Sequence, residues 1–151
     1  MSSGDRIAIV SVKHTGTNFM EAVVREAGFD TVAAHWSTYN KTRVSAIVSP
    51  IRNPLLTFRS WYSRNRFGGE FFKEWELFNQ AWLDGKIAHV QPIDTEDRDE
   101  HLKKLSEVLG STCVTDWKPV ASGEHLDPPK TDISQVLNLE VVKHFYGDLN
   151  E

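Results

Sequence analysis

The stretch "IAIVSVKHTGTNFMEAVV", residues 7–24, decides the fold because it changes from the pattern of a buried strand to that of a helix. Residues 7–12 are mostly apolar, which is typical of a strand buried on both faces in a parallel sheet. Four apolar side chains then recur at helical spacing: Phe19, Ala22, Val23 and Ala27. Gly28 follows where a helix would end. The stretch therefore predicts a strand, a short polar loop and a helix.

The rest of the chain continues this alternation. We predict further strands over residues 31–34, 44–48 and 87–93, and helices from residue 54 to about 64 and over 71–83, 97–109 and 133–146. Asn53 and Pro54 supply an N-cap and a proline at the first helical position. Three prolines mark residues 116–131 as a loop. Alternating strands and helices predict one three-layer α/β domain over residues 1–151, with a mainly parallel sheet of four or five strands.

The composition excludes several classes of protein. The chain has 151 residues, of which 40% are hydrophobic and 25% charged, as in ordinary globular domains. Its net charge of −4 gives no sign of a nucleic-acid partner, which usually meets a basic surface. No apolar run approaches the roughly 18 residues of a membrane span, the N-terminus is unlike a signal peptide, and Cys113 is the single cysteine. We therefore expect a reduced, cytoplasmic protein without a membrane partner.

The polar loop after the first predicted strand has the parts of an anion site. Such a loop places unpaired N–H groups beside the positive end of the helix dipole. Gly16 allows close backbone approach, and the hydroxyls of Thr15 and Thr17 are hydrogen-bond donors. Lys13 or His14 can add a positive charge. The alternative is that Gly16 serves only a tight turn and that Thr17 or Asn18 caps the helix. The Walker pattern, in which a lysine follows the last glycine, is absent.

A second group of residues follows the third predicted strand. In P-loop nucleoside-triphosphate enzymes an acid near this point helps to hold Mg²⁺, whereas this chain has Arg52. An arginine binds a phosphate directly through its paired planar donors, without a metal. Ser60 lies on the second turn of the helix that Pro54 begins, so its hydroxyl can face the same anion. The alternative is a surface ion pair for Arg52 and a neutral helical position for Ser60.

Taken together, these two stretches resemble the sulfotransferases that use 3′-phosphoadenosine-5′-phosphosulfate (PAPS). The family's 5′-phosphosulfate loop is commonly written PKSGTTW, and "KHTGTNF", residues 13–19, is similar to it. The family's 3′-phosphate motif is RNP with a serine eight residues after the arginine, and "RNPLLTFRSWY", residues 52–62, has both. The resemblance is clear over residues 7–62 and faint beyond. It implies a P-loop-like α/β/α domain.

The resemblance also implies roles for individual residues. Thr15, Gly16, Thr17 and Asn18 would bind the 5′ side of PAPS, and two further residues, Arg52 and Ser60, its 3′-phosphate. In ungapped register the family's loop lysine, which stabilises the leaving oxygen, aligns with His14, so either His14 as an imidazolium or Lys13 would take that role. PAPS is the implied co-substrate, and no metal is implied.

The implied reaction is direct in-line transfer of a sulfuryl group to an acceptor hydroxyl or amine. A general base should accept the acceptor's proton. We predict His35 for this role because it follows the second predicted strand, and the ends of parallel strands converge on the ligand crevice. The sequence identifies neither the acceptor nor the oligomeric state.

Two other functions remain open. The first is a P-loop kinase acting on a nucleotide or small metabolite, which would need Mg²⁺ and an acid near the loop. The second is a non-catalytic module that binds a nucleotide or a protein partner on the same fold, because fold alone does not establish activity.

Overall fold

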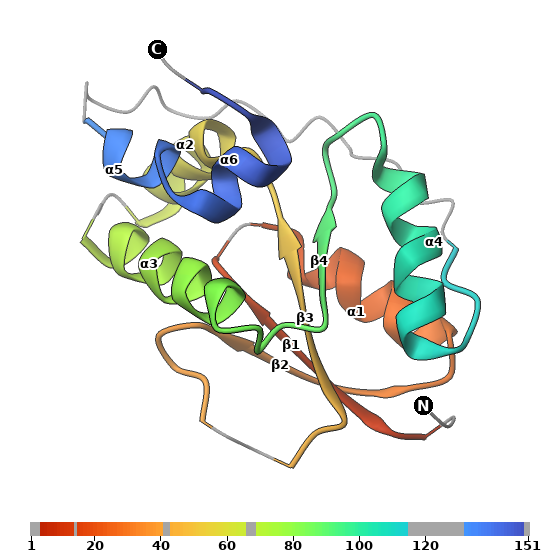
Figure 1. Cartoon of the computed structure of the whole chain (residues 1–151). Coiled ribbons are helices and arrows are strands. Elements are labelled where there is room, and N and C mark those ends of the chain that lie inside the picture. Colours follow the sequence, from red (N-terminus) through yellow and green to blue (C-terminus); the bar gives the residue numbers. More distant parts are fainter. Residues whose placement is uncertain (1–3, 14, 41–42, 66–68, 115–131, 150–151) are drawn as a thin grey trace.

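The computed structural model describes residues 4–13, 15–40, 43–65, 69–114 and 132–149 (Figure 1). In this part of the chain, four strands form one sheet in the order β2-β1-β3-β4, and all are parallel: β1 (Arg6–Ser11), β2 (Asp30–His35), β3 (Ala46–Ile51) and β4 (His89–Pro92). Six helices accompany them: α1 (Thr17–Glu26), α2 (Pro54–Asn65), α3 (Gly69–Leu83), α4 (Arg98–Leu109), α5 (Ser134–Leu137) and α6 (Glu140–Tyr146). The predicted α/β class and parallel sheet are confirmed.

Helices cover both faces of the sheet, so the apolar core has two parts. On one face, α1 and α4 pack Phe19, Met20 and Leu105 against Ile7 and Ile9 of β1. On the other face lie α2, α3, α5 and α6, whose buried apolar side chains form a second cluster with Val12, Ile51 and Val90. Figure 1 shows the sheet between these two groups of helices. A strand that meets apolar helices on both faces must be apolar at successive positions, which explains the run at residues 7–12.

The core beneath α2 and α3 is aromatic. Phe71, Trp75 and Phe78 of α3 are fully buried and recur at helical spacing. The Phe71 ring lies at the centre of this group, 5.0 Å from the Phe58 ring and 5.7 Å from the Trp61 ring. This cluster joins α2 to α3 beneath the loop that follows β1.

The predicted strand at residues 44–48 lies two or three residues too early. Strand β3 begins at Ala46 and continues through Ser49 and Pro50, which pair with Val90 and Gln91 of β4. Ser49 and Pro50 look like a strand end in sequence because proline removes a ladder donor. Pairing with β4 and complete burial of Ser49 extend the strand.

The single closing helix predicted over 133–146 is wrong, because the structure has two short helices there. The chain is extended at Leu139, with φ −65° and ψ 144°. The cause lies in α3: Asn79 Nδ2 donates to Glu140 Oε2 at 2.8 Å, and Asn79 Oδ1 accepts a hydrogen bond from the Val141 N–H at 3.0 Å. A side chain 62 positions earlier thus caps the first turn of α6. The loop predicted over 116–131 lies outside the described residues.

None of the helices in the described ranges combines the length and the apolar composition needed to cross a bilayer.

Candidate functional site

The order of the strands brings three predicted site segments to one edge of the sheet. At the carboxyl end of β1, Ser11 lies opposite His35, the last residue of β2. On the other side, β1 pairs with β3, and Arg52 follows directly after β3. The loop at residues 12–16 therefore starts between His35 and Arg52. In an open parallel sheet the crevice outside the carboxyl ends of the strands is the usual place for a ligand.

Gly16 begins α1 in a backbone conformation that side chains disfavour. Its φ is 103° and its ψ 36°, and its carbonyl accepts the first helical hydrogen bond, from Met20 N–H at 3.1 Å. A Cβ at this position would lie 2.6 Å from Ile93 Cδ1. Glycine is thus needed both for the turn and for the close approach of the loop to the residue after β4. Gly16 is the N-cap, not Thr17 or Asn18, and within the described residues no side chain caps the helix. The N–H groups of Thr17 and Asn18, the first two residues of α1, therefore remain available to an anion.

The threonine hydroxyls of the loop make hydrogen bonds inside it. Thr15 is buried, and its Oγ1 donates to the Val12 carbonyl at 2.5 Å. Thr17 Oγ1 and Ser11 Oγ are hydrogen-bonded at 2.7 Å. These contacts fasten the loop to the end of β1. Thr15 therefore shapes the loop, whereas Thr17 also lines a cleft.

Lys13 extends toward the helices α2 and α3. Its Nζ lies 3.7 Å from Glu70 Oε2 and 5.4 Å from the centre of the Trp61 ring. The lysine side chain is 34% exposed and Glu70 is 69% exposed. Exposed ion pairs of this kind contribute little, about 0–1 kcal/mol, so an anion can compete for the lysine. His14 lies outside the described residues, and the choice between Lys13 and His14 stays open.

A cleft of about 540 Å³ opens beside the loop. Its wall contains Thr17 and Asn18 from the start of α1, Ala33, Ala34 and His35 from β2, and Thr38. Two residues predicted to bind the nucleotide thus share a cleft with the predicted general base, although 17 positions separate Asn18 from His35. His35 Nδ1 is buried and has no hydrogen-bond partner among the described residues. A buried polar atom without a partner is uncommon, and a role in binding or catalysis is one explanation for it.

The turn that carries Arg52 is fixed from two other elements. Asn53 Oδ1 accepts a hydrogen bond from Leu55 N–H at 2.9 Å, which confirms the predicted cap of α2. The Asn53 N–H donates to Asp94 Oδ2 at 3.0 Å, and Tyr146 OH donates to Asp94 Oδ1 at 2.5 Å. Burial and the Asp94 carboxylate raise the pKa of Tyr146, while the charge of Arg52 opposes this shift. The phenol therefore remains protonated and holds the carboxylate beside Arg52.

Ser60 and Thr57 lie on α2, at the spacing of one helix face with Asn53, the residue before the helix. Thr57 Oγ1 donates to the Asn53 carbonyl at 3.0 Å. Ser60 is 4% exposed. Its predicted contact with a 3′-phosphate stays a prediction.

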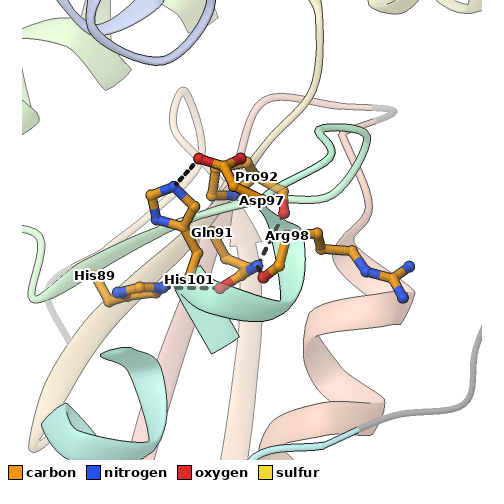
Figure 2. Close-up of polar contacts among 6 residues, drawn as sticks. All are labelled: His89, Gln91, Pro92, Asp97, Arg98 and His101. Carbon is orange, nitrogen blue, oxygen red and sulfur yellow. Dashed lines mark hydrogen bonds and ion pairs between the residues drawn. The ribbon is translucent and has the colours of Figure 1, made fainter. Parts of the chain in front are cut away.

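A buried polar network holds the loop between β4 and α4 (Figure 2). Gln91 is fully buried, and its Nε2 donates to the Pro92 carbonyl at 2.9 Å and to the Arg98 carbonyl at 3.0 Å. Its Oε1 lies 2.9 Å from His89 Nε2. The network connects the last residues of β4 to the first turn of α4, and so fixes Ile93 against Gly16. The signal for it in the sequence is a histidine and a glutamine at alternate positions of an apolar strand.

The same network makes stability depend on pH. Because both Gln91 N–H groups have carbonyl acceptors, its oxygen faces His89, whose Nε2 must be the protonated nitrogen of a neutral ring. Burial lowers the pKa of His89, assisted by the nearby charges of His101 and Lys104, while the Gln91 hydrogen bond opposes the shift.

The unfolded chain therefore binds a proton at His89 more readily than the folded chain. We expect the free energy of unfolding to fall as the pH drops below about 6.5, and the decline from this group to stop below its lowered pKa. Urea unfolding between pH 7.5 and 5 measures this slope. His89→Gln should reduce it. An unchanged slope in His89→Gln would contradict the assignment.

Glu74 was not recognised as a candidate in the sequence. It lies on α3 and is fully buried, and both of its oxygens accept hydrogen bonds from Ser37. The available signal was its position, three residues after Phe71 and four before Phe78, which puts a carboxylate inside the apolar stripe.

Within the described ranges, no three side chains of the types His, Cys, Asp or Glu are grouped so as to hold a metal ion. Comparison of the chain with models of protein families, with curated proteins and with solved structures found no match.

Proposed function

We propose that this chain is a sulfotransferase-like domain that binds PAPS in a P-loop-like site and transfers its sulfuryl group to an acceptor hydroxyl or amine. One observation carries the proposal: Thr17 and Asn18 share a cleft with His35, and Arg52 follows the strand on the other side of β1. Segments that carry residues suited to a nucleotide, the candidate base His35 and the cation Arg52 thus begin at the same edge of the sheet, although Arg52 is not among the residues that line this cleft.

The residues present fit such a co-substrate. Gly16 lets the loop turn into α1 while lying close against Ile93, and the N–H groups of Thr17 and Asn18 at the start of α1 favour an anion. We assign the 5′ side to the loop and the first turn of α1, with Thr15 shaping the loop from within. The paired donors of Arg52 suit the 3′-phosphate, assisted by Ser60.

When bound, PAPS supplies a sulfuryl group on a good leaving phosphate. In the transfer, a bond forms between the acceptor atom and sulfur, and the bond between sulfur and the 5′-phosphate oxygen breaks. The electron pair remains on that oxygen, and His35 takes the acceptor's proton. Lys13 or His14 stabilises the charge on the oxygen, since charge stabilisation and positioning account for most of the catalysis in such transfers.

A non-catalytic nucleotide-binding module is the second candidate. The observation that favours it is the ion pair between Lys13 and Glu70, which directs the lysine toward α3. PAPS turnover with a panel of hydroxyl and amine acceptors separates the two, because only the enzyme releases adenosine 3′,5′-bisphosphate.

Binding of the nucleotide is tested first by calorimetric titration with adenosine 3′,5′-bisphosphate, ADP and ATP, each with and without Mg²⁺. We expect the bisphosphate to bind most tightly and without Mg²⁺. A preference for ATP that depends on Mg²⁺ would favour the kinase and overturn the proposal.

Arg52→Ala should weaken binding of the bisphosphate much more than binding of ADP. The loss of charged hydrogen bonds of about 1.5–3 kcal/mol corresponds to roughly 10- to 150-fold in this preference. Arg25→Ala is the matched control, because Arg25 pairs with Glu21 near the far end of α1. If Arg52→Ala discriminates between the two ligands as well as the unsubstituted chain does, Arg52 does not bind the 3′-phosphate.

A further inference from the structure

The turn at residues 35–38 carries two residues of the cleft wall, His35 and Thr38. Thr38 N–H donates to the His35 carbonyl at 3.0 Å, so the two ends of the turn are tied together. The Trp36 N–H donates to the Ser11 carbonyl at 3.2 Å, which anchors the turn to β1. The position of the His35 ring therefore depends on the side chains that contact this turn.

Helix α3 holds this turn through a buried carboxylate. Glu74 Oε2 accepts a hydrogen bond from the Ser37 N–H at 2.8 Å, and Glu74 Oε1 accepts one from Ser37 Oγ at 2.9 Å. One helical turn further along α3, the Phe78 ring stacks on Trp36, with 5.9 Å between ring centres and 18° between planes. Two adjacent residues of the turn thus contact two positions on one face of α3.

A carboxylate is a costly choice for this position. Burying a charge or a carboxyl group is unfavourable unless it is well hydrogen-bonded, and an apolar side chain would suit the aromatic stripe of α3 better. The carboxylate offsets this cost by fixing the geometry of the turn, because its two oxygens hold both the N–H and the hydroxyl of Ser37.

We propose that Glu74 is a positioning residue, which through Ser37 holds the turn at residues 35–38 so that His35 stands at the cleft. The consequence for catalysis rests on the proposed function, because it assumes that His35 takes a proton from the acceptor. The contact itself is a property of the free chain, so it can be tested without a ligand.

Three variants separate the effect of the hydrogen bonds between Glu74 and Ser37 from the effect of the volume of the Glu74 side chain. Glu74→Ala removes both acceptors, and Ser37→Ala removes only the hydroxyl arm. Glu74→Gln keeps the shape, because its oxygen can accept the Ser37 N–H while its nitrogen donates to Ser37 Oγ. Glu76→Ala is the matched control, because Glu76 lies on the exposed side of the same helix.

The readouts are the NMR signals of the His35 imidazole, assigned by their loss in His35→Gln, and hydrogen exchange of the amide of residue 37. In Glu74→Ala we expect a displaced His35 signal and exchange at residue 37 faster by roughly 10- to 100-fold. Ser37→Ala should show a smaller change of the same kind. Glu74→Gln should restore most of both signals, and Glu76→Ala should leave them unchanged.

Calorimetry with adenosine 3′,5′-bisphosphate on the same variants separates this inference from the proposed function. With the proposed function correct, the variants bind the bisphosphate like the unsubstituted chain and lose PAPS turnover through kcat. If the His35 signal moves as expected but the unsubstituted chain does not bind the bisphosphate, the positioning role stands and the sulfotransferase proposal fails.

If the bisphosphate binds and Glu74→Ala leaves both NMR readouts unchanged, the positioning role is overturned. Should Glu74→Ala fail to fold, Ser37→Ala and Glu74→Gln provide the test instead. The positioning role then predicts a changed His35 signal in Ser37→Ala and a nearly unchanged one in Glu74→Gln. A Glu74→Gln variant that behaves like Ser37→Ala or worse would also overturn the proposed geometry.

Discussion

Replacing Phe71 by alanine is expected to lower the free energy of unfolding by about 3–5 kcal/mol. The Phe71 ring is fully buried and meets four other aromatic rings, which belong to Phe58, Trp61, Phe72 and Trp75. No neighbouring side chain of this rigid cluster can fill the volume of a lost ring, so the cavity adds to the lost burial. Guanidinium unfolding followed by circular dichroism measures the change.

This substitution also bears on the candidate site. Trp61 contacts Phe71 at 5.7 Å between ring centres and lies beneath Lys13 Nζ at 5.4 Å. A cavity at residue 71 should therefore let the Trp61 ring move, and with it the Lys13 side chain that lies over this ring. Phe71→Leu keeps most of the volume and should cost clearly less, and Leu77→Ala on the exposed side of α3 should cost least. A loss below about 1 kcal/mol for Phe71→Ala would show that this core is not closely packed.

Gly16→Ala is expected to damage both stability and nucleotide binding. A non-glycine residue in a disfavoured conformation costs on the order of 1–3 kcal/mol, and the new Cβ would lie 2.6 Å from Ile93 Cδ1. A shift of the Ile93 Cδ1 methyl can relieve part of this contact, but relief of the strained φ requires the loop to move, which would redirect the N–H groups of Thr17 and Asn18. We therefore expect a lower free energy of unfolding together with at least a tenfold loss of affinity for adenosine 3′,5′-bisphosphate.

The structure offers separate controls for the two causes, the positive φ of residue 16 and the contact of a new Cβ with Ile93. Gly85 also has a positive φ, +70°, but a Cβ there would meet nothing within 4 Å. Gly85→Ala thus reports backbone strain alone. In the double variant Gly16→Ala, Ile93→Ala, removal of the clashing side chain should restore part of the binding. If Gly16→Ala binds the bisphosphate normally, the loop is not the anion site.

Local patterns were sufficient for much of the fold. The apolar run at residues 7–12 and the helical spacing after it identify the first strand and helix because both signals depend on neighbours within a few residues. The cap at Asn53 was predictable for the same reason, and the structure confirms its hydrogen bond to Leu55. The break at Leu139 was not, because its cause is Asn79 on α3.

Some residues of the candidate site could also be predicted from local patterns, and others could not. Gly16 and Arg52 could be singled out by residue type and by their place after predicted strands. The hydroxyl of Thr15 looked like a ligand donor in sequence, yet it donates to the Val12 carbonyl. Glu74 and Gln91 interrupt apolar patterns in the sequence, but the pattern does not show which groups they bind: the partner of Glu74 is Ser37, 37 positions away, and Gln91 binds backbone carbonyls that have no sequence signature.

The sequence by itself therefore determined the class of fold, the polar loop between the first strand and helix, and the residue types that suit an anion, since these follow from periodicity and side-chain chemistry. Only the tertiary structure decided the strand order β2-β1-β3-β4, which places the loop between His35 and Arg52. It also decided the contacts of Glu74 with Ser37 and of Gly16 with Ile93. The physical reason is that strand pairing and burial join residues far apart in the chain, and no local pattern carries that information.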